Sequence, residues 1–230
     1  MPIQQNEVQL TGVFGGDVTH ALSAWCSTYR ELTTDRRTRL PIFLRSLAEN
    51  GHHTPFEKSY IQFLVRAEVP TQIHLLKHRI AVSVNSESAR YKELRDDNAY
   101  VPPDWPSKTQ ARLARLIEHC QSEYHEILKE LEEEGIPRKR AKESARFALP
   151  YASQYVLDVS FNFRSFVYFQ GLRNSSHAQK EVRDLAASML QQVVAHGDFR
   201  YSLLAFEKVR LPEPEWEVPT LRASSSPSTT

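Results

Sequence analysis

The longest stretch of helical periodicity in the chain lies between Ser107 and Gly135. Apolar side chains recur there every three or four positions, at Leu113, Leu116, Ile117, Cys120, Tyr124, Ile127, Leu128 and Leu131. This spacing predicts an amphipathic helix whose apolar stripe faces a core, and Gly135 is a typical helix stop. Because Cys120 lies on that stripe, we expect its thiol to belong to the core.

Shorter helices are predicted on either side of this one. Their ranges are 35–49, 70–80, 137–149 and 177–196. Asp35 is a candidate N-cap for the first of them, but Pro41 suggests a later start because proline disfavours helix interiors. The apolar stripe of the second helix consists of Ile73, Leu76 and Ile80.

Two segments show the alternation that predicts a strand. Ile61, Phe63 and Val65 share one face of 59–66, and 151–162 alternates more loosely. A period of two is typical of a strand with one buried face. Together with the helices, these segments predict an α+β fold with long helices and few strands.

The composition excludes several classes of protein. The chain has 230 residues, of which 40% are hydrophobic and 25% charged, as in ordinary globular proteins. Its 29 Lys and Arg residues against 28 Asp and Glu leave a net charge of +1, so we expect neither nucleic acid nor an acidic membrane as a partner. Two cysteines cannot form a disulfide framework, and no apolar run approaches the ~18 residues of a membrane span. The first residues lack the pattern of a signal peptide, so we expect a cytoplasmic protein.

The C-terminal segment differs in composition from the rest of the chain. After Leu211 it is rich in Pro, Glu and Ser, and it ends in SSSPSTT. Such a segment cannot bury enough apolar surface to order itself. We therefore expect one domain over 1–211 and a disordered tail over 212–230, whose removal leaves the activity intact.

Polar side chains gather in four places along the chain. The first is GHHTPFE at 51–57, a loop in which His52, Thr54 and Glu57 project around a proline. Ordinary turn chemistry explains this loop when it is taken alone. Two adjacent histidines without a third ligand at useful spacing do not predict zinc, so we expect no metal site.

The second place is KHR at 77–79, followed by the polar span SVNSESARY at 83–91. The planar fork of arginine suits phosphates and carbonyl groups, although a KHR triplet taken alone is more often a solvated helix face. The density of polar groups in 83–91 is typical of neither a helix face nor a strand, and it indicates a binding segment.

The third place is the basic run 138–142 and the arginine that follows it. The run itself is typical of a solvated helix face. Arg146, in contrast, lies among apolar neighbours close to Pro150, and we expect it to point inward.

The fourth place is a segment rich in aromatic residues that also carries Asn162, Arg164, Arg173 and His177. Arginines in such surroundings need anionic partners or hydrogen bonds. A ligand can supply them, and so can a structural ion pair.

Taken in order, these motifs resemble the flavin-dependent thymidylate synthases. The resemblance covers about 27–186 and includes GHHTPFE, KHR with the serine-rich span after it, the helix that ends at Leu149-Pro150, and N-F-R leading to L-R-x-x-S-H-A-Q. Each motif is weak alone, and four of them in the family's order make a strong signal.

The resemblance implies a homotetramer of single α+β domains, each with long helices packed on a small mixed or antiparallel sheet, and with active sites between subunits. It also implies FAD as cofactor, NADPH and 5,10-methylenetetrahydrofolate as co-substrates, and methylation of dUMP at C5 without a cysteine nucleophile. Neither Cys26 nor Cys120 has the partner spacing of a nucleophilic cysteine, in agreement with that chemistry.

The resemblance also assigns roles to individual residues. The cofactor-binding residues would be His52, Thr54, Glu57, Lys77, His78, Arg79, Asn162, Arg164, Tyr168 and His177. The nucleotide-binding residues would be His74, Ser86, Glu87, Ser88, Ala89, Arg90, Arg173 and, from another subunit, Arg146. Arg173 and Ser88 would be catalytic, with the Arg173 guanidinium against the uracil edge, where it stabilises negative charge on the ring.

Several positions near the implied ligands depart from the family's pattern. Lys77 replaces an arginine, His74 a glutamine, Tyr168 an asparagine and Ser86 an acidic residue, and eight residues instead of seven separate Arg79 from Ser88. These departures leave two interpretations level. One is a thymidylate synthase acting on dUMP, and the other is a specialised UMP methylase of the polyoxin type.

Non-catalytic interpretations form the competing class. One is a degenerate family member that binds flavin or nucleotide without turnover. The other is a helical nucleic-acid-binding protein that uses the basic run 138–142, and the near-neutral net charge counts against it.

Overall fold

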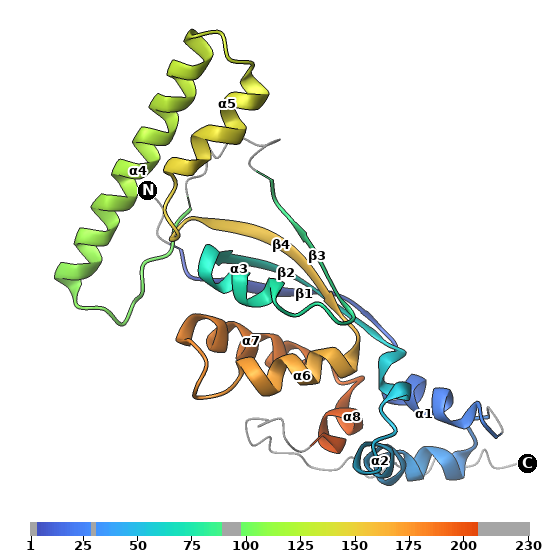
Figure 1. Cartoon of the computed structure of the whole chain (residues 1–230). Coiled ribbons are helices and arrows are strands. Elements are labelled where there is room, and N and C mark those ends of the chain that lie inside the picture. The colour runs from blue at the N-terminus through green and yellow to red at the C-terminus, as the bar shows by residue number, and fades with distance from the viewer. Residues whose placement is uncertain (1–3, 29–30, 89–97, 207–230) are drawn as a thin grey trace, which may run out of the picture.

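A four-stranded antiparallel sheet lies at the centre of the computed structural model, which describes residues 4–28, 31–88 and 98–206 (Figure 1). The strands are β1 (Glu7–Phe14), β2 (Tyr60–Glu68), β3 (Val82–Ser86) and β4 (Gln154–Phe161). Their order in the sheet is β1-β2-β4-β3, so β3 is an edge strand hydrogen-bonded to β4.

The two central strands bury alternate side chains. In the register of β2 with β4, Phe63 lies opposite Val159 and Val65 opposite Leu157, and all four side chains are fully buried. Removing one apolar face from water in this way is the main force that holds a sheet to its helices. The strand predicted over 59–66 is therefore confirmed.

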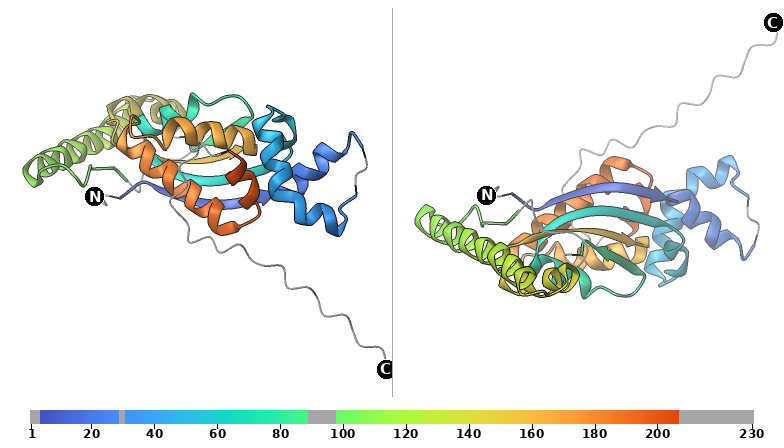
Figure 2. Two further views of the ribbon diagram at one scale, coloured as in Figure 1. Left: turned by 90° about the horizontal axis from the view of Figure 1, so that it is seen from below. Right: turned by 90° about the horizontal axis from the view of Figure 1, so that it is seen from above.

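The helices are α1 (Asp17–Trp25), α2 (Thr34–Glu49), α3 (Val69–Leu76), α4 (Ser107–Glu133), α5 (Arg138–Ala145), α6 (Phe163–Arg173), α7 (Lys180–His196) and α8 (Arg200–Ala205). Short 3-10 turns follow α2 and α5, namely η1 (Thr54–Glu57) and η2 (Arg146–Ala148). The helices α6 and α7 cover one face of the sheet, and the other face is open in the right-hand view of Figure 2.

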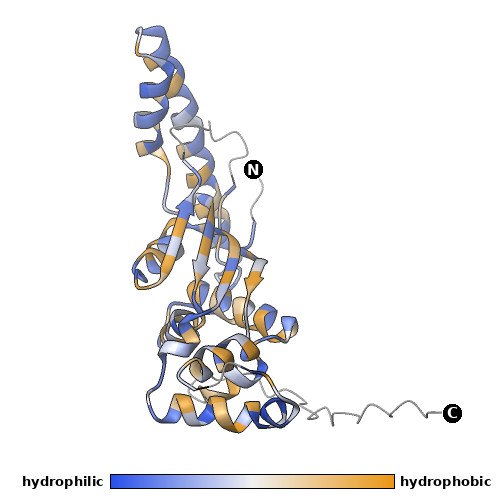
Figure 3. Ribbon diagram, turned by 90° about the vertical axis from the view of Figure 1, so that its right-hand side faces the viewer, coloured by the Kyte–Doolittle hydropathy of each residue, from blue (hydrophilic) through white to orange (hydrophobic). Residues whose placement is uncertain are grey.

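Two helical units lie at opposite ends of the sheet. The helices α4 and α5 form a hairpin that projects from one end, whereas α1 and α2 pack near the other (Figure 1). Figure 3 shows hydrophilic and hydrophobic residues alternating along the hairpin. In its interior Tyr124 and Leu128 of α4 pack on Ala141 and Ala145 of α5.

The prediction of an α+β fold with long helices on a small antiparallel sheet is confirmed, as is the long helix between Ser107 and Gly135. The prediction that the Cys120 thiol belongs to the core is wrong, because its side chain is only partly buried. The helix α4 packs mainly on α5 and η2, so part of its apolar stripe stays exposed, and Leu116, one turn before Cys120, is 54% exposed.

The polar span after KHR requires a second correction. The first residues of 83–91 were expected to be neither helix nor strand, and Val82–Ser86 forms β3. An edge strand with one hydrogen-bonded neighbour exposes much of its surface, which allows polar side chains that a central strand would exclude. The pairing of Val82 with Phe161 holds the segment in the sheet.

The apolar stripe predicted for the helix after Pro70 is also wrong. Leu75 is buried, whereas Ile73 and Leu76 are 41% and 51% exposed, and the helix ends at Leu76 before reaching Ile80. The burial of this short helix is decided by its contact with β2 and α7 and not by its own periodicity.

The helix after Thr33 begins earlier than Pro41 suggested. The Thr33 side chain caps it by accepting a hydrogen bond from the Arg36 amide at 3.3 Å, so Asp35 lies in the first turn instead of capping it. Pro41 lies inside the helix on an exposed position.

Within the three described ranges, no helix is both long and apolar enough to cross a membrane. The tail predicted over 212–230 lies outside the described residues.

Candidate functional site

A cavity of about 560 Å³ opens between η1, the turn before β3, and α6. Its lining residues are Glu57, Lys77, His78, Arg79, Ile80, Ala81, Val82, Asn162, Arg164, Ser165, Tyr168, Leu172 and Arg173. Four lysine or arginine side chains face one carboxylate there, so the cavity is electropositive. Its size and its mixture of cationic, aromatic and aliphatic groups suit a planar anionic ligand.

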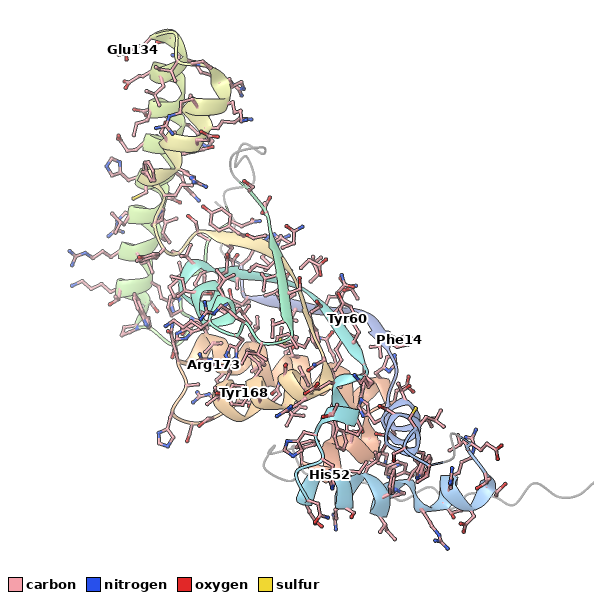
Figure 4. All side chains as sticks on the ribbon, turned by 45° about the vertical axis from the view of Figure 1, so that its right-hand side comes forward. Phe14, His52, Tyr60, Glu134, Tyr168 and Arg173 are labelled. Carbon is pink, nitrogen blue, oxygen red and sulfur yellow. The ribbon has the colours of Figure 1, made fainter. Side chains whose placement is uncertain are left out.

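The helix α6 presents one face to the cavity and the other to the core. Arg164, Tyr168 and Leu172 are spaced by four residues and lie on one face, while Phe166 and Phe169 are fully buried. This division explains why the segment mixes aromatic and polar residues, because its phenylalanines pack under the sheet and its polar residues line the cavity. Figure 4 shows Tyr168 and Arg173 along this helix.

Asn162 fixes the start of α6. Its side-chain Oδ1 accepts a 2.8 Å hydrogen bond from the Ser165 amide, which makes Asn162 the N-cap of the helix. The Ser165 hydroxyl donates a 2.7 Å hydrogen bond to the carbonyl of Ile80. The backbone amide of Asn162 donates one of 3.2 Å to the carbonyl of Ala81. The helix start thereby holds the turn that carries the KHR triplet.

That turn contains a strained residue. Ala81 has a φ of 53°, in the left-handed region that a side chain with a Cβ disfavours. The contacts of the turn with α6 hold this strained conformation. The preceding segment from Lys77 to Arg79 lines the cavity.

Two lining residues of the cavity, Glu57 of η1 and Arg164 of α6, form an ion pair. Both side chains keep part of their surface in water, so the pair contributes little to folding. It links the GHHTPFE loop to α6 and holds one cation in the cavity lining.

His78 and Arg173 meet at the inner wall of the cavity. The Arg173 Nε donates a 2.9 Å hydrogen bond to the His78 Nε2. Burial lowers the pKa of His78 to about 4, and the electrostatic interactions with Arg173 and His74 act in the same direction. The His78 imidazole is therefore neutral at pH 7.

A second group of the expected residues lies at the other end of β3. Val82, at its start, lines the cavity, whereas Ser86 ends the strand. Beyond it, the Glu87 amide donates a 2.8 Å hydrogen bond to the carbonyl of Val156 and the Glu87 carboxylate accepts one from the Val156 amide at 3.3 Å. Ser88 follows on the same stretch and is partly buried.

Arg146 was expected to point inward, and its side chain is exposed in the chain. It follows Ala145, which fills the contact of α5 with α4, so the next residue turns away from the hairpin interior. Burial raises the pKa of Tyr155 of β4, and the charge of Arg146 lowers it, which places the guanidinium within electrostatic range of that strand.

Some expected residues lie outside both groups or outside the described chain. His52, Thr54 and His177 are exposed and do not line the cavity, and in Figure 4 His52 lies apart from Tyr168 and Arg173. Ala89 and Arg90 lie outside the described residues.

Five further residues line the cavity that the sequence motifs did not predict, namely Ile80, Ala81, Val82, Ser165 and Leu172. Leu172 follows Arg164 and Tyr168 at helical spacing, and that signal could have found it. No local pattern marks Ala81, because its strained backbone depends on contacts with α6. Among the described side chains, no cluster of three or more His, Cys, Asp and Glu residues is arranged to hold a metal ion.

Comparisons with known proteins agree with the motif order. Residues 15–196 match a family model described as thymidylate synthase complementing protein. The flavin-dependent thymidylate synthase of Kosmotoga olearia is 31% identical over 81% of this chain and 84% of its own. That of Pseudothermotoga lettingae is 32% identical over 80% of this chain and 83% of its own.

A solved structure has the same fold. The UMP/dUMP methylase PolB from Streptomyces cacaoi, bound with 5-Br dUMP, superposes with a TM-score of 0.72 at 26% identity, covering 89% of this chain and 96% of its own. The same enzyme bound with 5-Br UMP gives a TM-score of 0.72 at 25% identity, covering 90% and 97%.

Proposed function

Because the chain belongs to the thymidylate synthase complementing protein family, the flavin-dependent thymidylate synthases, we propose that it methylates a uridine monophosphate at C5. The carbon comes from 5,10-methylenetetrahydrofolate, which is released as tetrahydrofolate, and the C5 hydrogen leaves as a proton. NADPH supplies the two electrons that reduce the transferred methylene group to a methyl group. A bound FAD would carry those electrons.

The observation that carries this proposal is the composition of the cavity. Of the residues to which the resemblance gives a role, eight line it: Glu57, Lys77, His78, Arg79, Asn162, Arg164, Tyr168 and Arg173. They come from three separate motifs, and the fold brings them to one place.

The cavity residues fit a dinucleotide. Lys77, Arg79 and Arg164 supply cations for a pyrophosphate, and arginine can bind phosphate oxygens in pairs. Tyr168 and Leu172 supply flat and aliphatic surface for a ring system.

Arg173 is the residue proposed to act on the nucleotide. Its Nε is engaged by His78, which leaves the two Nη groups as donors. A guanidinium presented in this way stabilises negative charge that develops on the uracil ring, and a ring with more negative charge is a better carbon nucleophile at C5.

The proposed nucleotide-binding residues suggest that one chain does not complete a site. Val82 and Ser86 are separated by four residue steps, about 13 Å along a strand. Arg146 is exposed and lies within electrostatic range of Tyr155, two residues from the partner of Ser86 in β4, whereas Arg173 lies at the cavity. We therefore propose a homotetramer in which Arg146 of one subunit and Arg173 of another bind the same nucleotide.

The proposal is tested with the purified full-length protein. Its absorbance spectrum reports bound flavin, and parallel reactions with FAD, NADPH, methylenetetrahydrofolate and either dUMP or UMP report the sugar that is accepted. Arg173→Ala should lower product formation by about 100-fold or more with flavin still bound. Arg115→Ala, on the exposed surface of α4, is the matched control for loss of an arginine.

Turnover of dUMP alone would identify a thymidylate synthase, and comparable turnover of UMP a ribonucleotide methylase. A colourless protein with no turnover of either nucleotide contradicts the proposal. Equal activity of wild type and Arg173→Ala contradicts the role of Arg173.

Sharing of sites between subunits has its own test. Arg146→Ala and Arg173→Ala proteins should each be inactive, and mixing them under conditions that exchange subunits should restore activity at sites that receive both arginines. If the mixture stays as inactive as its components, each site lies within one chain.

A further inference from the structure

We propose that His78 is a positioning residue, whose neutral imidazole accepts a hydrogen bond from Arg173 and holds the guanidinium with its two Nη groups toward the cavity. The proposal rests on the function proposed above, in which Arg173 binds the nucleotide. It assigns His78 a role toward Arg173, in addition to any contact it makes with a cofactor.

The geometry of the pair fixes the protonation of the imidazole. Arginine has donors only and stays protonated in proteins. The nitrogen that accepts from Arg173 Nε at 2.9 Å, His78 Nε2, must therefore carry no proton. A neutral ring then carries its proton on Nδ1, and a protonated ring would place two cations in contact.

The protein holds the ring in place from several sides. The His78 amide donates a 3.0 Å hydrogen bond to the carbonyl of Leu75 at the end of α3. The imidazole packs edge-on against Phe169, with ring centroids 5.1 Å apart, and against Tyr168 at 6.3 Å. Because Phe169 is fully buried, the side chain of His78 cannot easily swing away from Arg173.

The charged and titratable groups around the imidazole keep it neutral. Arg173 and Tyr168 face it from α6, His74 faces it from α3, and Lys77 and Arg79 flank it in the chain. Burial, together with the electrostatic interactions with Arg173 and His74, holds the pKa of His78 at about 4. The acceptor therefore persists over the whole range in which the protein would work.

Without this acceptor Arg173 would lose its fixed orientation. It is the last residue of α6, and its side chain has four rotatable bonds and is partly exposed. Fixing Nε to His78 selects one orientation of the planar group before a ligand binds, which reduces the entropy lost on binding.

Two substitutions at position 78 separate positioning from packing. In His78→Gln the amide oxygen can take the place of Nε2 as acceptor, whereas His78→Leu fills the space without an acceptor. In the flavin-loaded full-length protein, His78→Leu should weaken binding of dUMP and UMP by about tenfold and lower kcat, and His78→Gln should recover most of the loss.

The same pair of variants in an Arg173→Ala background provides the control. If His78 acts through Arg173, the difference between Gln and Leu disappears once the guanidinium is gone. A difference that persists in this background, or a His78→Leu protein that binds nucleotide as well as His78→Gln, overturns the proposal.

A measurement without nucleotide tests the pair directly. In protein labelled with ¹⁵N-histidine, the His78 Nε2 should be unprotonated at pH 7, with a titration midpoint far below that of an ordinary histidine. Arg173→Ala should raise that midpoint. A His78 that titrates near its ordinary pKa or carries its proton on Nε2 overturns the proposal, even if no nucleotide binds and the proposed function itself has failed.

Discussion

The carboxylate of Asp17 accepts a 2.7 Å hydrogen bond from the backbone amide of Ser202, 185 residues further along the chain. It also accepts one of 2.8 Å from the Tyr201 amide, so a residue at the start of α1 caps the first turn of α8. His20, one turn later on α1, lies 2.8 Å from the Ser202 hydroxyl and 2.9 Å from that of Ser59. This buried polar cluster joins the N-terminal helix to the end of the described chain.

The first prediction concerns the pH dependence of stability. Burial raises the pKa of Asp17 to about 6, although its hydrogen bonds act in the opposite direction. The folded state then holds this proton more tightly than the unfolded state, so the contribution of Asp17 is full below about pH 4 and is lost as the pH rises to about 6. The loss is on the order of 3 kcal/mol.

Urea unfolding measures this contribution when it is repeated between pH 3.5 and 7 at steps of about half a pH unit. The stability of wild type relative to Asp17→Asn should fall with rising pH across that window. His20 is present in both proteins, which matters because burial lowers its pKa to about 3 and its contribution runs the other way. Asp35→Asn, on an exposed position, is the control, and a pH-independent difference for Asp17→Asn contradicts the prediction.

The second prediction concerns the strained turn at Ala81. Glycine adopts a φ of 53° without the steric cost that a Cβ imposes, so Ala81→Gly should keep or raise the stability by up to about 1 kcal/mol. Ala81→Val should lower it, because a β-branched side chain tolerates this region least. Thermal unfolding measures both, and a Gly variant less stable than the Val variant would show that the turn is not under strain.

The third prediction concerns Tyr168, which occupies a position where the family usually has asparagine. Tyr168 lines the cavity and is 65% exposed, so its ring offers a flat surface to a ligand. Tyr168→Phe should bind FAD as wild type does, and Tyr168→Ala should weaken binding about tenfold because the stacking surface is gone. Titration of the flavin-free proteins with FAD gives the dissociation constants. Equal affinity of Tyr168→Phe and Tyr168→Ala for FAD would contradict the prediction.

Flavin emission is a second readout for the same residue. Tyrosine quenches the fluorescence of a flavin that it touches, and phenylalanine does not. Bound FAD should therefore be brighter in Tyr168→Phe than in wild type. Tyr168→Asn, which restores the family's residue, should give bound FAD the same fluorescence as Tyr168→Ala, because neither side chain quenches it.

The fourth prediction concerns Lys77, which replaces the first arginine of the family's triplet. Arginine can bind two oxygens of a phosphate at once, and lysine binds as a point charge. Lys77→Arg should therefore tighten the binding of FAD by about threefold to tenfold. Lys108→Arg at the start of α4 is the matched control, and unchanged affinity in Lys77→Arg would mean that Lys77 does not reach the pyrophosphate.

Part of the fold could be predicted because it depends on local periodicity. The stripe from Leu113 to Leu131 predicted α4, and the alternation of Ile61, Phe63 and Val65 predicted β2. The edge strand β3 was missed, because its polar residues are stabilised by pairing with β4 and not by an apolar face of their own.

The candidate site was likewise predictable from the sequence only in part. The residue types and their order along the chain determined by themselves which family the protein resembles and which side chains were candidates. Only the tertiary structure decided that Glu57 pairs with Arg164, that Ser86 and Arg146 lie away from the cavity, and that Arg173 donates to His78. These relationships join residues about one hundred positions apart, and local sequence patterns carry no information on which distant side chains the packing of α6 against the sheet will bring into contact.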